Sequence, residues 1–190
     1  SSMCFDLSVY DVFGAFSTGA TLCLVSSQKD VDVLVRALGE MKITFWNSVP
    51  AILDMVVKNL EAGYVNSHLT RALLSGDWIP LPLPDAVRKH FPNCEVTSLG
   101  GATEGSIWSI YYPIGDVDPK WSSIPYGYPL ANQTFYVLNY LRTLCPVGVP
   151  GELFIGGDGV AEGYLNDQEK TGDSYFQHPQ LGRIYKTGDH

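Results

Sequence analysis

The sequence predicts an α/β fold: a largely parallel sheet flanked by helices, followed by a smaller β-rich subdomain with a distorted, barrel-like sheet. Between Ser8 and Gly101, segments with helical apolar spacing alternate with short, continuously apolar runs, which is typical of a parallel sheet covered on both faces. After Tyr112, prolines, glycines and aromatic residues dominate, and turns divide short strand-like runs. We therefore expect an α/β subdomain over residues 1–112 and a β-rich subdomain over residues 113–190.

Apolar residues at helical spacing, such as i, i+3, i+4 and i+7, predict the first three helices of the first subdomain, and a proline-framed segment predicts a short fourth helix. These helices cover residues 9–16, 31–41, 50–60 and 84–91. Asp6 or Ser8 is placed to cap the first helix and Asp30 the second, and Pro50 suits a first helical turn. The apolar runs between the helices predict strands, followed by turns, within Thr21–Val25, Ile43–Pro50, Ala72–Gly76 and Glu95–Gly101.

The second subdomain is expected to be antiparallel. Residues 111–130 show no helical period, and only Asp167–Phe176 favours a short helix. The predicted strands are Thr134–Leu138, Gly151–Gly157 and Gly182–Asp189.

The composition excludes several classes of function. Of the 190 residues, 45 % are apolar and 17 % are charged, as in ordinary globular proteins. With 20 acidic against 12 basic residues, the formal charge of -8 provides no basic footprint for nucleic acid or an anionic membrane. No apolar stretch approaches the roughly 20 residues that span a bilayer. Four scattered cysteines, none of them in a CxxC pair, favour small buried thiols in a reducing cytoplasm and no zinc site.

Ligands of parallel α/β sheets bind beyond the carboxyl ends of the strands. The loops predicted at those ends are Asn47–Pro50, Ser75–Trp78 and Gly100–Glu104. The last loop belongs to the sequence LGGATEG, in which glycines permit close approach of a ligand to the backbone. Its threonine hydroxyl can bond a phosphate oxygen and its glutamate can hold Mg²⁺. A tight turn with a capping Thr103 and a solvated Glu104 is the alternative interpretation.

Two later motifs have both a functional and a plain structural interpretation. GELFIGGDGVAEGYL (Gly151–Leu165) has the glycine spacing GxGxxxG, which departs from the dinucleotide fingerprint, so a hairpin with glycine bulges explains it better. YKTGD (Tyr185–Asp189) ends in a carboxylate that could bind ribose hydroxyls. An ordinary turn aspartate is the favoured interpretation of that motif alone.

In this order, FDLSVYD (Phe5–Asp11), LGGATE (Leu99–Glu104), GELFIGGDGVAEGYL and YKTGD resemble successive core motifs of adenylate-forming enzymes, in particular adenylation domains of nonribosomal peptide synthetases. The resemblance covers essentially the whole chain. It implies that an amino-acid carboxylate attacks the α-phosphate of Mg-ATP, and that a phosphopantetheine thiol on a carrier domain then takes the aminoacyl group. It also implies Mg²⁺ at Glu104 and an ATP site at Gly100, Gly101, Ala102, Thr103 and Asp189.

The resemblance further implies an amino-acid pocket in which Asp6 pairs with the α-ammonium group of the substrate. Capping of a helix is the alternative role of Asp6. The other implied positions are Leu7, Tyr10, Asn47, Leu73, Ser75, Leu99, Ile107 and Trp108. Together they resemble the pocket signature of cysteine-activating domains, which typically belong to assembly lines such as siderophore synthetases. A mostly apolar cup with a few weak polar groups is compatible with a small thiol, although each apolar member alone also fits a plain core role.

The sequence departs from the family pattern in several places. Gly100 stands where an aromatic residue usually stacks on adenine, Ala102 replaces a usual proline, and Glu162 replaces a common arginine. Nothing matches the family's phosphate-gripping loop upstream of Phe5 or its catalytic lysine subdomain downstream of His190. We therefore expect an internal fragment that folds, contains no catalytic residue, binds nucleotide weakly at best and does not catalyse adenylation alone.

Two alternatives stay open at this point. An acyl- or aryl-acid CoA ligase would have no use for a carboxylate at Asp6, because its substrates lack an α-amino group. A non-catalytic interaction module would not need Thr103, Glu104 and Asp189 at motif positions. The expected partners are an amino acid and the carrier and condensation or cyclisation domains of the same assembly line, with no nucleic acid and no membrane.

Overall fold

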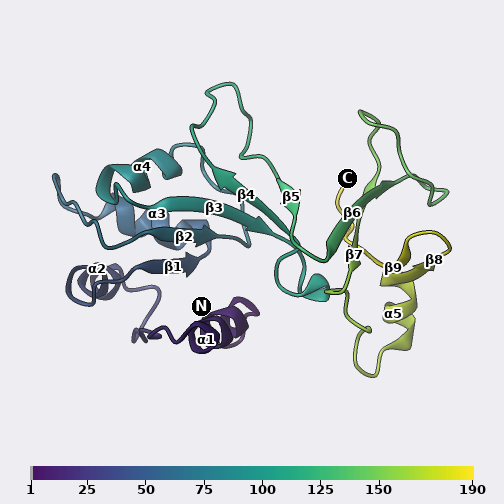
Figure 1. Cartoon of the computed structure of the whole chain (residues 1–190), viewed down its shortest axis with the longest axis horizontal. Coiled ribbons are helices and arrows are strands. Elements are labelled where there is room, and N and C mark those ends of the chain that lie inside the picture. Colours follow the sequence, from purple (N-terminus) through teal and green to yellow (C-terminus); the bar gives the residue numbers. More distant parts are fainter. Residues whose placement is uncertain (1) are drawn as a thin grey trace. The chain divides into compact units, whose positions relative to one another are not determined.

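The computed structural model describes residues 2–190, which form two compact units (Figure 1). Unit 1 runs up to Leu99 and also contains Tyr112–Gly127. Unit 2 contains Gly100–Tyr111 and Tyr128–His190. The chain therefore enters unit 2 at the end of a glycine-containing strand, returns to unit 1, and enters unit 2 again.

Unit 1 is built on three parallel strands, β1 (Phe45–Ser48), β2 (Arg71–Leu74) and β3 (Glu95–Gly100). The same sheet has two further strands, β4 (Ile110–Ile114), which runs from unit 2 into unit 1, and β5 (Tyr128–Pro129) of unit 2, and these pair with each other in antiparallel fashion. The whole sheet has the order β1-β2-β3-β4-β5, so its parallel part is confirmed and the complete sheet is mixed.

Helices bury one face of the parallel strands. The helices of unit 1 are α1 (Leu7–Thr18), α2 (Val31–Glu40), α3 (Pro50–Lys58) and α4 (Leu83–His90) (Figure 1). Ala72 and Leu74 of β2 and Val96 of β3 are buried in one apolar cluster with Leu53 of α3 and Val87 of α4. Each large aliphatic side chain buried in this way contributes about 1.5–3 kcal/mol. The core therefore occupies the face that these strand residues share, and the opposite face is available for other contacts.

Helix α2 follows its sequence signals closely. The Asp30 carboxylate accepts hydrogen bonds from the backbone N–H groups of Asp32 (3.1 Å) and Val33 (3.3 Å), so its predicted role as a cap is confirmed. Leu34 and Leu38, one turn apart, are buried in the core. A satisfied N-cap of this kind contributes about 1 kcal/mol to helix stability.

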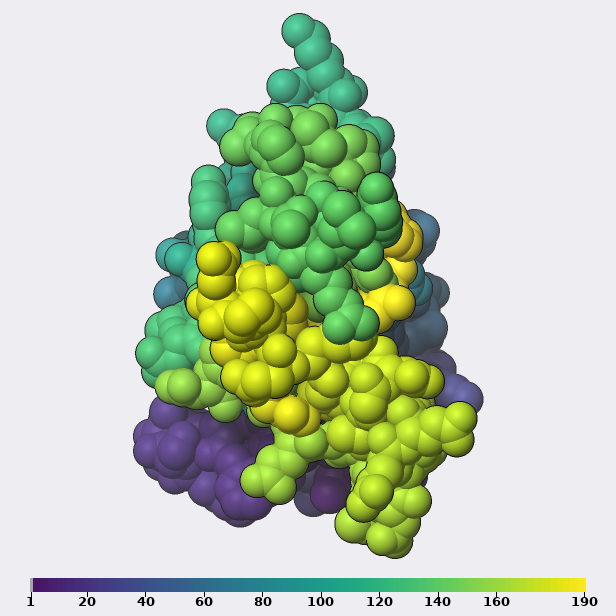
Figure 2. Space-filling model, turned by 90° about the vertical axis from the view of Figure 1, so that its right-hand side faces the viewer, coloured from purple at the N-terminus to yellow at the C-terminus, as the bar shows by residue number. Residues whose placement is uncertain are grey.

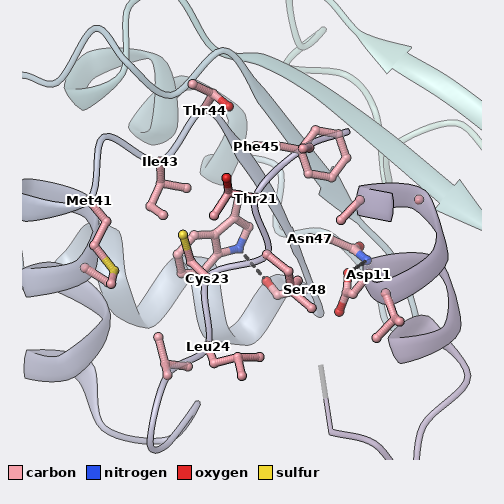
Figure 3. Close-up of a pocket in the computed structure, with 18 of the residues that line it drawn as sticks. Asp11, Thr21, Cys23, Leu24, Met41, Ile43, Thr44, Phe45, Asn47 and Ser48 are labelled. Atoms are coloured by element: carbon pink, nitrogen blue, oxygen red, sulfur yellow. Dashed lines mark hydrogen bonds between the residues drawn. The ribbon is translucent and has the colours of Figure 1, made fainter. Parts of the chain in front are cut away.

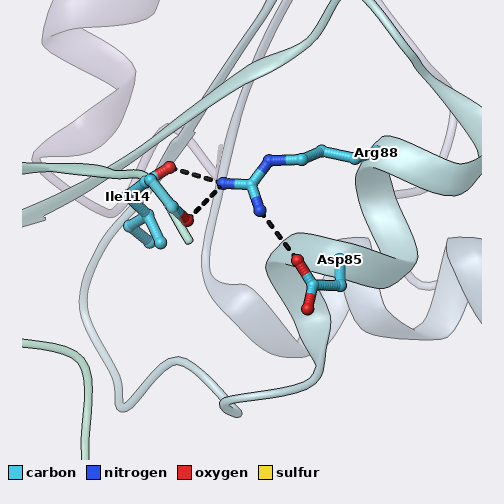
Figure 4. A network of polar contacts seen from close by, with 4 residues as sticks. Asp85, Arg88 and Ile114 are labelled. Carbon is cyan, nitrogen blue, oxygen red and sulfur yellow. Dashed lines mark hydrogen bonds and ion pairs between the residues drawn. The ribbon is translucent and has the colours of Figure 1, made fainter. Parts of the chain in front are cut away.

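The Arg88 side chain of α4 hydrogen-bonds to the backbone at the end of β4. Its guanidinium group donates to the carbonyl oxygens of Ile114 (2.5 Å) and Gly115 (2.8 Å) and also pairs with the Asp85 carboxylate (2.8 Å) (Figure 4). The Asp85 side chain is largely exposed, so that ion pair contributes little by itself. The two carbonyl contacts are charge-assisted and fix where β4 ends.

Unit 2 has an antiparallel sheet of order β6-β7-β9-β8, as predicted for this part of the chain. Its elements are β6 (Gln133–Leu138), β7 (Glu152–Gly157), α5 (Gln168–Ser174), β8 (Tyr175–His178) and β9 (Gly182–Lys186). Phe154 and Ile155 are consecutive on β7 and point to opposite faces, so each anchors its own apolar cluster. The C-terminal segment, shown in yellow, reaches the surface (Figure 2).

The predicted strand at Thr21–Val25 is wrong. This segment forms no strand, and its backbone makes no hydrogen bond to another backbone group within residues 2–190. A strand requires a neighbour that pairs its N–H and C=O groups, and an apolar run alone does not supply one. Leu24 is accordingly 82 % exposed.

Other differences concern short strands. The predicted helix at Asp167–Phe176 is shorter than expected, because α5 ends at Ser174 and Tyr175 begins β8. Strands β4 and β5 were not predicted, since both contain proline and neither alternates clearly. These short strands are recognisable only through their pairing partners.

All four cysteines are free. Burial raises the pKa of the Cys94 thiol to about 11, so this group stays protonated and serves as a small apolar side chain. Cys4 is exposed, so the prediction of a buried thiol is wrong there.

Within residues 2–190, no helix combines the length and apolarity needed to cross a bilayer.

Candidate functional site

One face of the parallel strands gathers the predicted pocket residues of the sheet. The registers place Asn47 of β1 beside Leu73 of β2, and Leu73 beside Thr97 of β3. Side chains two residues apart share a face, so Leu99 of β3 lies on the same side as Thr97. Ser75 follows directly after β2 and continues its ladder by donating its N–H to β1 (3.3 Å). All of these residues alternate with the residues buried against α3 and α4 and therefore belong to the other face.

Helix α1 packs on this same face at the edge strand β1. The amide Nδ2 of Asn47 donates to Oδ1 of Asp11 at 2.7 Å (Figure 3). The ring centroids of Tyr10 and Phe45 are 6.2 Å apart. Phe45 and Asn47 share a face of β1, so both contacts place α1 over the pocket face. Asp11 lies in the FDLSVYD motif, but sequence reasoning assigned it no role, because its partner is 36 positions away.

Asp6 occupies the N-cap position of α1 without capping the helix through its side chain. Ser8, the other predicted cap, is inside the helix and buried. The prediction of a side-chain cap at either residue is therefore wrong. Helix capping, the alternative role that the sequence left open for Asp6, is therefore not observed. The neighbouring residue, Leu7, is 2 % exposed.

An open cavity of about 970 Å³ lies beside α1, α2 and β1 in unit 1 (Figure 3). Its walls are mainly apolar and include Cys23, Met41 and Ile43. Among the predicted substrate residues, Tyr10 and Asn47 line it. The predicted residues of unit 1 that do not line this cavity are Asp6, Leu7, Leu73, Ser75 and Leu99.

The Asn47 side chain has a fixed orientation. A carboxylate can only accept hydrogen bonds, so Asp11 requires the nitrogen of the Asn47 amide to face it. The Oδ1 atom of Asn47 is then buried and accepts no hydrogen bond from the described residues. An unpaired buried acceptor costs about 1–3 kcal/mol. The arrangement therefore leaves one acceptor available for a donor.

In unit 2, a tight loop joins β3 to β4 and holds most of the predicted nucleotide residues, while Asp189 lies elsewhere. A short 3-10 turn, η1 (Thr103–Gly105), follows Gly101, and the Ser109 N–H donates to the Gly100 carbonyl oxygen at 2.8 Å. Ser106 and Ile107 have positive φ values of 66° and 67°. Such a backbone costs of order 1–3 kcal/mol, most for a β-branched residue, and occurs mainly at functional loops. The predicted pocket residue Ile107 thus holds a strained position next to the buried Trp108.

Gly101 is required by close backbone packing. Its φ is 152°, and a Cβ atom there would lie 2.7 Å from the Ser109 nitrogen and 3.0 Å from the Trp108 Cα. We expect Gly101→Ala to destabilise the protein by about 1–3 kcal/mol, measured by denaturant unfolding. The matched control is Gly172→Ala in α5, where a Cβ meets nothing within 4 Å and should be neutral or slightly stabilising. Equal stability of the two variants would contradict this account of the loop.

The Glu104 carboxylate of η1 is half-buried in a group of tyrosines. The hydroxyl of Tyr164 donates to Oε1 of Glu104 at 2.5 Å. Burial raises the pKa of Tyr175 to about 12, with the neighbouring Tyr164 and Glu104 adding to it. Burial, a hydrogen bond to Tyr164 and the charge of Glu104 raise the pKa of Tyr185 further. These phenols therefore stay protonated. Sequence reasoning missed Tyr164, which lies 60 positions from its partner.

Asp189 is exposed after the turn that follows β9. Gly188 has a φ of 83° and turns the chain there. The Asp189 N–H donates to Thr187 Oγ1 (3.0 Å), and its carbonyl oxygen accepts from the Leu153 N–H (2.8 Å). The backbone is thus held against β7, which leaves the carboxylate at the surface for a ligand.

The predicted site residues are divided between the two units. Unit 1 holds Asp6, Leu7, Tyr10, Asn47, Leu73, Ser75 and Leu99. Unit 2 holds Gly100, Gly101, Ala102, Thr103, Glu104, Ile107, Trp108 and Asp189.

A family model described as "AMP-binding enzyme" matches residues 1–165. The chain belongs to the AMP-binding enzyme family.

The relatives of this AMP-binding enzyme chain include several synthetases. It is 62 % identical over 190 residues to bacitracin synthase 1 of Bacillus licheniformis, covering 100 % of this chain and 4 % of the relative. It is 42 % identical over 194 residues to pyochelin synthetase PchF of Pseudomonas aeruginosa, covering 100 % and 11 %. A crystal structure of the nonribosomal peptide synthetase FmoA3 aligns with a TM-score of 0.94 at 40 % identity, covering 99 % of this chain and 21 % of that one. The chain thus spans a small part of the relatives it matches.

The part of the chain that the structure describes has no cluster of metal-binding side chains. Within residues 2–190, no group of three or more His, Cys, Asp or Glu side chains is placed to hold a metal ion. Mg²⁺ usually keeps several waters and is bound by one or two carboxylates together with substrate phosphates. Glu104, half-buried on a glycine turn, fits that mode of binding.

Proposed function

We propose that this chain is part of an adenylation domain that activates L-cysteine with Mg-ATP. The observation that carries the proposal is the gathering of Asn47, Leu73, Ser75 and Leu99 on one sheet face, next to α1 with Tyr10. Membership of the AMP-binding enzyme family supports the reaction class. FmoA3 also supports it, because forms of that protein bound to AMPPNP and to α-methyl-L-serine-AMP align with TM-scores of 0.93 and 0.92.

In the proposed reaction, a carboxylate oxygen of the amino acid attacks the α-phosphorus of ATP. A new P–O bond forms, the bond to the β-phosphate oxygen breaks, and pyrophosphate leaves. Asp6 holds the α-ammonium group, Thr103 bonds the phosphate region and Asp189 binds the ribose hydroxyls. Mg²⁺ at Glu104 supplies neutralisation of phosphate charge, which together with positioning accounts for most phosphoryl-transfer catalysis.

The second proposed step transfers the aminoacyl group to a carrier domain. The phosphopantetheine thiol attacks the aminoacyl carbonyl, a thioester forms and AMP leaves. The relatives are much longer than this chain, which is consistent with carrier and condensation or cyclisation domains as partners. Four free cysteines are consistent with a reducing cytoplasm.

The cysteine assignment depends on the resemblance of the pocket positions to the signature of cysteine-activating domains, and the chemistry of those positions is compatible with it. Leu73 and Leu99 supply apolar surface, while Asn47 Oδ1 is a buried acceptor without a partner among the described residues. A thiol S–H is a weak donor of suitable size for such an acceptor. Near-isosteres such as serine are separated by only about 1–3 kcal/mol in a pocket of this kind. The pocket is therefore compatible with cysteine, and the signature carries the assignment.

Pyrophosphate exchange in a full-length adenylation domain that carries this sequence tests the proposal. We expect exchange to depend on L-cysteine, with serine and 2-aminobutyrate at least about tenfold less effective in kcat/KM. 2-Aminobutyrate is the matched control because a methyl group replaces the thiol. Exchange driven by a different amino acid would contradict the cysteine assignment, and exchange driven by an aryl or fatty acid would contradict the amino-acid pocket.

A further inference from the structure

The glycine-rich segment Gly157–Leu165 hydrogen-bonds directly to the turn that carries Glu104. The Ala161 N–H donates to the Glu104 carbonyl oxygen at 2.9 Å. The Ser106 hydroxyl donates to the Gly159 carbonyl oxygen at 2.9 Å. This segment therefore contacts η1 at the Glu104 backbone and, through the Ser106 side chain, at the residue that follows η1. The proposed reaction has no other use for the segment.

Tyr164, near the end of the same segment, reaches the functional atom of that turn. Its hydroxyl donates to Glu104 Oε1 at 2.5 Å, the length of a strong charge-assisted hydrogen bond. Tyr164 itself is fixed by three neighbours. Its N–H donates to Thr171 Oγ1 (2.9 Å), the Lys170 ammonium lies 4.1 Å from its ring centroid, and the Tyr175 ring lies 5.7 Å away.

We propose that Tyr164 is a positioning residue that holds the Glu104 carboxylate in the orientation in which it binds Mg²⁺, with Gly157–Leu165 as the support. The proposal rests on the proposed function only in taking Glu104 as the Mg²⁺ ligand. A carboxylate has about four lone-pair sites on its two oxygens, so accepting one phenol leaves capacity for a cation. The partners that orient metal-binding carboxylates typically change metal affinity by about 10–100-fold when they are removed.

The test uses Tyr164→Phe in a full-length adenylation domain that carries this sequence, with Tyr140→Phe as the matched control. Tyr140 is 92 % exposed, so the same chemical change there removes no such contact. We expect the Mg²⁺ concentration for half-maximal pyrophosphate exchange to rise about tenfold in Tyr164→Phe, with an unchanged KM for the amino acid. Calorimetry should show unchanged AMPPNP binding without Mg²⁺ and about tenfold weaker enhancement of that binding by Mg²⁺.

Three results would contradict either the positioning role of Tyr164 or the Mg²⁺-binding role of Glu104, and they show which of the two is wrong. Tyr164→Phe with the Mg²⁺ dependence of the wild type and of Tyr140→Phe would overturn the positioning role. Glu104→Gln with unchanged Mg²⁺ dependence would instead overturn the metal role of Glu104 in the proposed function. If Tyr164→Phe fails to fold, Ser106→Ala removes a different bond to the same segment, and an unchanged Mg²⁺ dependence there would also overturn the inference.

Discussion

Asp6→Asn is expected to lower kcat/KM for the amino acid by about 30- to 5,000-fold, because removing one partner of a buried charge pair costs about 2–5 kcal/mol. The start of helix α1 should not be weakened by the substitution. Asp6 makes no side-chain capping bond to α1, and asparagine is as good a residue at that position as aspartate. Pyrophosphate exchange and thermal unfolding of the same variant separate the two effects.

The control for this prediction is Asp116→Asn, which removes the charge of an exposed carboxylate in the same unit. A des-amino substrate sharpens the test. 3-Mercaptopropionate lacks the α-ammonium group, so the wild type should discriminate against it far more strongly than Asp6→Asn does. If Asp6→Asn retained normal activity with cysteine, the residue would not bind the α-ammonium group, and a ligase for acids without an amino group would become the better interpretation.

Glu104→Gln is expected to reduce pyrophosphate exchange by about 10²–10³-fold, the usual effect of removing one preorganised electrostatic group. The glutamine oxygen can still accept from Tyr164, so the loop should keep its structure while the charge for the cation is lost. Exchange rates are measured over a range of Mg²⁺ concentrations. Glu169→Gln, at an exposed position of α5, is the charge-matched control, and equal activity of the two variants would exclude a metal role for Glu104.

Local signals in the sequence predicted much of the fold. The apolar spacing of α2 and its Asp30 cap identify the helix correctly, because both act within one or two turns. The apolar run at Thr21–Val25 shows the limit of such signals. Apolarity reports a preference for burial, whereas a strand also needs a partner for its backbone, and the described chain provides none. Strand β8 was missed for the same reason, since its pairing with β9 defines it.

The candidate site was predictable only in part. The order of four motifs led to the family, which the comparison confirms. The contacts that hold the site were not predictable, because Asp11–Asn47 and Tyr164–Glu104 join residues 36 and 60 positions apart. Neither Asp11 nor Tyr164 has a distinctive local pattern. Their importance depends on which side chains the sheet and the loops bring together.

The loop between Gly100 and Ser109 has a consequence for how such a pocket changes during evolution. Its path is set by a glycine, by strained backbone angles and by a main-chain bond between its two ends. The glycine and the main-chain bond involve neither the Ile107 nor the Trp108 side chain, and the positive φ of Ile107 is less costly for residues that are not β-branched. Under the proposed function, substitutions at those two positions would alter the shape offered to a substrate while the path of the backbone persists.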